Sequence, residues 1–182
     1  GTGNAIAANA AAGIGRDRRA AAIHASFARG DGFSTAAVGT EDDGYRQWNL
    51  GARGEYEIAP GWSAFGNLNH TDATVDIDGF PPPDYAFADT SERQDTTTWS
   101  GMAGLLFETA PTRISASFQM ADTKRDSFDE DLGEAPQFGF EGRTERAELR
   151  ARQALGSGLA LRTGGELEWS SFSSTFDAPQ DQ

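Results

Sequence analysis

The feature that most constrains the fold of this chain is an alternation of apolar and polar residues with a period of two. Between residues 45 and 56, one parity holds Trp48, Leu50 and Tyr56, and the other holds polar residues such as Asn49 and Glu55. Successive side chains of a β-strand point to opposite faces, so this segment is predicted to be a strand with one apolar and one polar face. The alternation recurs in residues 4–14, 20–29, 62–70, 97–108, 113–120, 147–152 and 159–169. The sequence therefore predicts eight strands and no helix.

The connections between these strands alternate in length. Short turns are predicted at residues 16–18, 59–61, 110–112 and 156–158, and they recur after 43, 51 and 46 residues when measured from Asp17, Pro60, Pro111 and Ser157. Three acidic windows rich in Gly, Pro, Ser and Thr lie between them and are interpreted as loops: residues 41–43, 72–95 and 122–134. Each period is thus one long antiparallel hairpin. Short turns at one rim and long loops at the other are typical of outer-membrane β-barrels.

The aromatic residues support a membrane barrel over a soluble sandwich. Trp48 and Tyr56 share a face eight residues apart, as do Trp99 and Phe107. At ~3.3 Å per residue and a tilt near ~40°, the rings are about 20 Å apart along a membrane normal, close to the spacing of two aromatic girdles. A β-sandwich remains the alternative, with the aromatic residues at the ends of its core. The remaining apolar positions are mostly Ala, Gly, Leu and Thr, which would fill an inter-sheet gap of ~10 Å poorly.

Composition excludes several classes of function. The chain has 15 basic and 28 acidic residues and a net charge of −13, which argues against a nucleic-acid partner. It has no Cys, which excludes disulfides, thiolate catalysis and Cys-ligated metals. Its two His residues are isolated, and pairs such as Arg150 and Glu166 are expected to form ion ladders along the wall. We therefore expect no enzyme activity and assign no catalytic residue.

Four segments carry a resemblance to a known family. They are residues 39–45 (GTEDDGY) leading into a strand, residues 62–70, the pair of segments 78–81 (DGFP) and 88–90 (ADT), and a strand that ends at Phe107. In order and spacing, over roughly residues 3–140, they resemble the first third of the barrel of TonB-dependent outer-membrane receptors. Among these receptors the chain is most similar to the cobalamin transporter type.

This resemblance implies a 22-stranded barrel in the bacterial outer membrane, plugged by an N-terminal domain. Such a receptor imports a scarce metal chelate when the TonB energy-coupling protein of the inner membrane pulls on the plug. The chain shows no plug sequence and no coupling box, and it ends without an aromatic-terminated strand. We therefore expect residues 1–182 to be one partial barrel domain of a larger receptor, facing the lipid bilayer. A siderophore receptor, a passive outer-membrane pore and a soluble β-sandwich binding module are the alternatives.

The resemblance also implies a calcium site, and the Pro-rich loop offers a candidate substrate surface. Cobalamin receptors bind calcium through acidic side chains of their extracellular connections, and by position the matching residues are Glu41, Asp42, Asp43, Asp78 and Asp89. Hard oxygen ligands in loops suit calcium. Glu41 departs from the family pattern, which has a shorter Asp there, and a solvated acidic loop surface is the alternative. Three aromatic residues of the Pro-rich loop are predicted to stack on a flat macrocyclic ligand: Phe80, Tyr85 and Phe87. Packing of these aromatic residues within the loop itself is the alternative.

Overall fold

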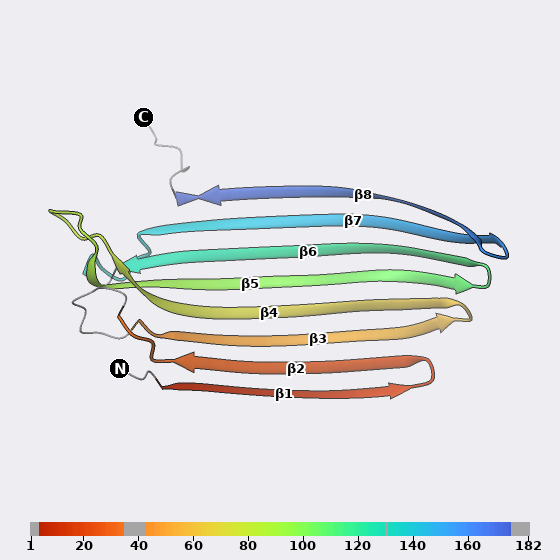
Figure 1. Cartoon of the computed structure of the whole chain (residues 1–182), viewed down its shortest axis with the longest axis horizontal. Helices are drawn as coiled ribbons and strands as arrows, with labels where there is room; N and C mark the ends of the chain where they lie inside the picture. Colours follow the sequence, from red (N-terminus) through yellow and green to blue (C-terminus); the bar gives the residue numbers. More distant parts are fainter. Residues whose placement is uncertain (1–3, 35–42, 130, 176–182) are drawn as a thin grey trace.

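The chain forms a single antiparallel sheet of eight strands in the computed structural model, which describes residues 4–34, 43–129 and 131–175. The strands follow one another in chain order across the sheet, from β1 to β8 (Figure 1). They are β1 (Ala5–Arg16), β2 (Arg19–Gly30), β3 (Tyr45–Ala59), β4 (Trp62–Gly79), β5 (Ala88–Thr109), β6 (Thr112–Asp129), β7 (Phe138–Gly156) and β8 (Leu159–Ser174). The all-β, up-and-down architecture and the number of strands predicted from the sequence are confirmed.

The two rims of the sheet differ as the sequence predicted. Tight turns at 17–18, 60–61, 110–111 and 157–158 join strands at the right-hand rim of Figure 1, and the longer connections lie at the left-hand rim. Two of these turns require glycine, since Gly61 and Gly158 have φ angles of +79° and +87°. We call these rims the turn rim and the loop rim.

The interpretation of the acidic windows as loops is wrong for most of their length. Strand β4 continues through residues 72–79, β5 begins at Ala88, and β6 continues through residues 122–129. Polar side chains pair across these extensions, as where Thr97 Oγ1 donates to Asp72 Oδ2 at 3.4 Å and Arg125 Nε donates to Thr96 Oγ1 at 3.2 Å. A hairpin whose two faces both meet water needs no apolar face, so a polar composition did not mark the end of the strand.

The register places the apolar residues of all the strands on one face. Trp48, Leu50, Leu105, Phe118 and Leu149 lie on this apolar face, and residues such as Asn49, Thr98 and Ser117 lie on the opposite, polar face. The apolar face is the more exposed one: Leu50, Leu105, Phe118 and Leu149 are 46–55% exposed, whereas Asn49, Thr98 and Ser117 are half-buried. No side chain in the described ranges is fully buried.

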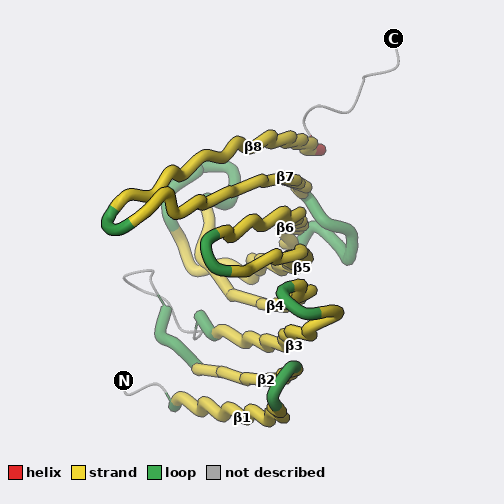
Figure 2. Tube along the Cα trace, turned by 90° about the vertical axis from the view of Figure 1, so that its right-hand side faces the viewer, coloured by secondary structure: helices red, strands yellow, loops and turns green. Residues whose placement is uncertain are grey.

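No second layer covers the apolar face. Seen along the strands, the described chain is one stack of neighbouring strands (Figure 2). The soluble β-sandwich considered as an alternative is therefore wrong for the described residues, because a sandwich presses two sheets together. Among these residues there is also no helix long and apolar enough to cross a membrane.

Candidate functional site

Aromatic rings gather at two levels of the apolar face. Near the loop rim, Phe27 lies 4.3 Å from Trp48 and His70 lies 4.2 Å from Trp99 between ring centroids. Near the turn rim, Trp62 and Phe107 are 4.8 Å apart, with Tyr56 on the adjoining strand. We call these groups the loop-side band (Phe27, Trp48, His70 and Trp99) and the turn-side band (Tyr56, Trp62 and Phe107).

Each of the strands β3, β4 and β5 contributes one ring to each band, always eight residues apart. The sequence predicted this spacing for β3 and β5 but not for β4, where it joins His70 to Trp62. Eight residues of a tilted strand span about 20 Å along a membrane normal, close to the apolar belt of ~25 Å in outer-membrane barrels. The two bands therefore frame a surface of the height that a bilayer covers.

The polar face carries a row of hydrogen-bonding side chains that crosses five strands. The members are paired in register from β2 to β6: Ser26, Asn49, Thr71, Thr98 and Thr123. Asn49 is its centre, because its Nδ2 donates to Ser26 Oγ at 3.1 Å and its Oδ1 accepts from Thr71 Oγ1 at 2.8 Å. Asn49 Oδ1 also accepts from Gln47 Nε2 at 3.1 Å, and the hydroxyls of Thr98 and Thr123 are 3.2 Å apart. Such a row suits a wall that faces water.

His24 lies on the polar face against the backbone of the next strand. A Cβ atom added at Gly51 would come within 2.1 Å of His24 Cε1 and 2.6 Å of Asn69 Oδ1. Gly51 thus leaves the space that the imidazole occupies. The ring is thus part of the packing of the polar face.

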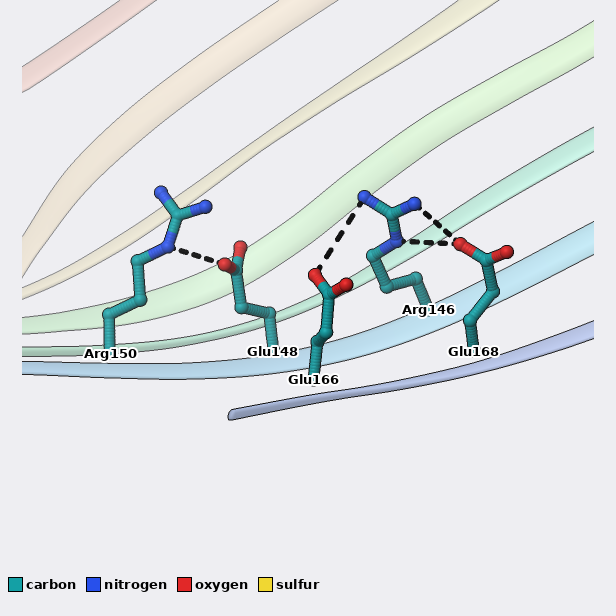
Figure 3. A network of polar contacts seen from close by, with 5 residues as sticks. All are labelled: Arg146, Glu148, Arg150, Glu166 and Glu168. Atoms are coloured by element: carbon teal, nitrogen blue, oxygen red, sulfur yellow. Dashed lines mark hydrogen bonds and ion pairs between the residues drawn. The ribbon is translucent and has the colours of Figure 1, made fainter. Parts of the chain in front are cut away.

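Five charged residues of β7 and β8 form an ion network on the polar face (Figure 3). Arg146 Nε donates to Glu168 Oε2 at 2.9 Å, and its guanidinium lies 4.0 Å from Glu166. Arg150 pairs with Glu148 on its own strand. Register places Arg150 opposite Gly164, so the direct contact of Arg150 with Glu166 considered from the sequence does not form. The expected ion ladder does form, with Arg146 in place of Arg150.

Two of the predicted calcium ligands meet at the loop rim. Asp78 is the next-to-last residue of β4 and Asp89 is the second residue of β5. Ser34 Oγ lies 3.5 Å from Asp78 Oδ2 and 3.4 Å from Asp89 Oδ1. The backbone N–H of Thr90 also donates to Asp78 Oδ1 at 3.3 Å. Pairing of β4 with β5 brings the two carboxylates together. Ser34 was not predicted from the sequence as part of this group, because nothing in the residues around Ser34 indicates which strand its side chain will face.

The remaining predicted ligands are Asp43, Glu41 and Asp42. Asp43 lies just before β3, where its carbonyl oxygen would be 1.9 Å from a Cβ at Gly32, a residue with φ of +70°. Glu41 and Asp42 lie outside the described residues. Within the described ranges, no three His, Cys, Asp or Glu side chains are grouped so that they could hold a metal ion. The five-ligand calcium site therefore stays a prediction.

Glu92 adds a third carboxylate to this end of the sheet. It lies on β5 seven residues beyond Trp99 of the loop-side band, and its carboxylate lies over Gly79, where a Cβ would approach Oε1 to 1.7 Å. Partial burial raises the pKa of Glu92, and the negative charges of Asp129 and Asp78 raise it further. The acids at this rim thus repel one another, and a cation there would relieve the repulsion.

The three predicted substrate-binding aromatics lie between β4 and β5. Phe80 and Phe87 are brought together at the base of the connection, with ring centroids 5.4 Å apart. Tyr85 lies on the turn between them, 69% exposed, with φ of +50° and its N–H bonded to Pro81 O at 3.1 Å. A positive φ is uncommon for a bulky residue and marks a position held by its surroundings. The structure thus presents exposed aromatic surface beside Asp78 and Asp89.

Neither the protein-family models nor the curated protein sequences that were compared match this chain. Among solved structures, the chain is similar to BauA, the ferric preacinetobactin receptor from Acinetobacter baumannii. The similarity has a TM-score of 0.66 and covers 97% of this chain at 13% sequence identity. The chain spans 35% of the length of that receptor. The comparison shows that this chain shares its fold with a segment of that receptor.

Proposed function

We propose that the chain forms part of the barrel of a TonB-dependent outer-membrane transporter that imports a metal chelate. The observation that carries the proposal is that the apolar face is the exposed one and is framed by two aromatic bands. In water such a face would be an extended apolar patch of the kind that drives association. In a membrane, lipid acyl chains would cover this face, so it would not drive association.

The backbone supports a place in a larger barrel. Within the described residues, every strand from β2 to β7 is hydrogen-bonded on both sides, but β1 and β8 each have one neighbour. A sheet edge is not tolerated in the hydrocarbon region, so further strands are needed to close the wall. We propose that the remaining strands and a plug domain belong to the complete transporter, and that the plug contacts the TonB energy-coupling protein.

The cargo is proposed to be bound at the loop rim. Cobalamin is the first candidate, since the resemblance of residues 39–45 and 78–90 is to cobalamin transporters. A ferric siderophore is the second, favoured by the likeness to a receptor for ferric preacinetobactin. The rings of Phe80, Tyr85 and Phe87 offer stacking surface to either ligand.

We propose that calcium orders the same rim. Asp78 and Asp89 already face Ser34, and Glu92 is close to Asp78, so negative charge is concentrated where the connections begin. Asp43, with Glu41 and Asp42, would supply the other oxygen ligands. The chemistry fits calcium, which takes about 6–8 oxygen ligands.

Ligand titration of the full-length protein in detergent tests this proposal. We expect saturable binding of cyanocobalamin that tightens with calcium and weakens in a Tyr85→Ala variant. A Phe33→Ala variant is the control, since it removes another exposed aromatic residue outside the aromatic group of the β4–β5 connection. Tight binding of a ferric siderophore and none of cyanocobalamin would assign the second candidate. Binding of neither, with free diffusion of small solutes through reconstituted protein, would show the passive pore instead.

A further inference from the structure

A pair of arginines lies on the apolar face at the turn rim. Arg16 and Arg19 are direct register partners at the ends of β1 and β2, and both are exposed. Arg19 is in turn paired with Tyr56 of the turn-side band. Both arginines therefore lie at the level where the aromatic residues of a barrel meet the lipid head groups.

Nothing in the described part of the chain neutralises this pair. Neither guanidinium makes an ion pair there, whereas Arg18, in the turn between them, forms an ion pair with Glu57 at 3.5 Å. Asp17 in the turn forms no ion pair with either of them among the described residues. Like charges placed directly opposite one another on a sheet are destabilising. A bound anion would reverse that effect.

An apolar hollow of about 530 Å³ adjoins the two arginines. Its wall is made by the small residues Ala21, Gly54 and Ala64, with Ile14 and the ring of Tyr56. Glu55 also borders the hollow, but its parity places it on the polar face. The small side chains thus leave a depression in the lipid-facing surface directly beside two unneutralised positive charges.

We propose that this surface binds one anionic glycerophospholipid, with its phosphate held by Arg16 and Arg19 and an acyl chain seated in the hollow. The inference rests on the proposed function, since it requires the apolar face to meet lipid. Guanidinium groups bind phosphate through paired hydrogen bonds, and the hollow accepts a chain without displacing a side chain. Short turns lie on the periplasmic side of bacterial barrels, so the lipid would come from the inner leaflet of the outer membrane.

Native mass spectrometry of the full-length protein, titrated with phosphatidylglycerol or phosphatidylcholine, tests this proposal. We expect preferential retention of phosphatidylglycerol, reduced roughly 25-fold in an R16Q/R19Q variant, from about fivefold for each arginine near an anionic lipid. An R53Q variant is the matched control, because Arg53 is also exposed but lies on the polar face. An A21L variant, which fills the hollow, should weaken binding while both arginines remain.

Three outcomes would overturn the lipid site. They are an unchanged affinity in R16Q/R19Q, an equal loss in R53Q, and equal affinities of the unmodified protein for the two lipids. Unchanged binding in A21L would overturn the acyl seat. If the unmodified protein inserts into bilayers and binds its chelate but shows one of these outcomes, the lipid site fails alone. If it does not insert, the proposed function itself fails.

Discussion

The two faces of the sheet share one backbone and differ in exposure and in side-chain contacts. On the polar face, side chains contact their neighbours: Asn49 bonds three other residues, and His24 fills the space above Gly51. On the apolar face, residues such as Leu50 and Leu105 stand half-exposed with no protein over them. The hydrogen bonds of Asn49 thus belong to the polar face, whereas the apolar face has ring contacts within its two bands and is otherwise open to its surroundings.

A charge placed on the apolar face between the two bands should give the largest difference in stability between the two faces. Ala103 lies midway between Trp99 and Phe107, so Ala103→Arg should destabilise the folded protein by about 2–4 kcal/mol, the cost of a cation at the bilayer midplane. The matched control is Met102→Arg, at the same depth on the polar face, where the loss should be well below this. Chemical unfolding of the full-length protein from lipid vesicles measures both. Equal losses would show that the two faces do not differ in solvent.

Replacing a glycine by a larger residue should give the next largest difference in stability between the two faces. Gly51→Val places a side chain against His24 and Asn69, so we expect a loss of about 1–3 kcal/mol, as for overpacking in a filled site. Gly54→Val is the control, because its Cβ would meet only Ala20 O, at 3.7 Å.

Adding His24→Ala to the Gly51→Val protein should recover part of the loss, measured by unfolding in the same vesicles. If the double variant is no more stable than Gly51→Val alone, the imidazole is not what the valine displaces.

The hydrogen-bonded row predicts a smaller effect. Asn49→Ala removes three side-chain hydrogen bonds, but water can replace them at a half-exposed wall, so we expect a loss of about 1 kcal/mol. Asn67→Ala on the same face is the control, since Asn67 makes no side-chain hydrogen bond among the described residues. A stability difference between the two variants near zero would mean that the row is not formed in the bilayer.

The acidic rim predicts the mildest effect, a dependence of stability on pH. Because its pKa is raised, the carboxyl of Glu92 holds a proton more tightly in the folded than in the unfolded protein. Stability should therefore fall as pH rises from the ordinary pKa of Glu through the raised value, and recover as pH falls. Glu92→Gln should flatten this window when unfolding is measured in the presence of a calcium chelator. A slope that persists in the variant would assign the titration to another group.

Strand positions were predictable because each hairpin keeps its period of two wherever one of its faces is apolar. The face of Trp48 and the turn at Pro60 follow directly from the residues nearby. The ends of β4 and β6 were not predictable, because above the loop-side band both parities are polar and composition no longer distinguishes strand from loop.

Contacts between side chains on different strands depend on the register of strand pairing, which the alternation of residues in a single strand does not reveal. Strand pairing, not chain proximity, brings Ser34 beside Asp78, and it joins Arg146 to Glu168 while Arg150 meets Gly164. The predicted ligands Asp78 and Asp89 nevertheless lie together, since they flank the connection between β4 and β5 of one hairpin.

The contrast between the faces can be measured residue by residue along β5. The chain has no Cys, so single cysteines at each position of residues 98–105 can carry a nitroxide spin label in the full-length protein reconstituted in vesicles. Labels at Trp99, Gly101, Ala103 and Leu105 should collide mainly with oxygen, which concentrates in lipid. Labels at Thr98, Ser100, Met102 and Gly104 should collide mainly with a water-soluble nickel chelate. Collision rates that do not alternate, or that alternate in the opposite phase, would contradict a lipid-facing apolar wall.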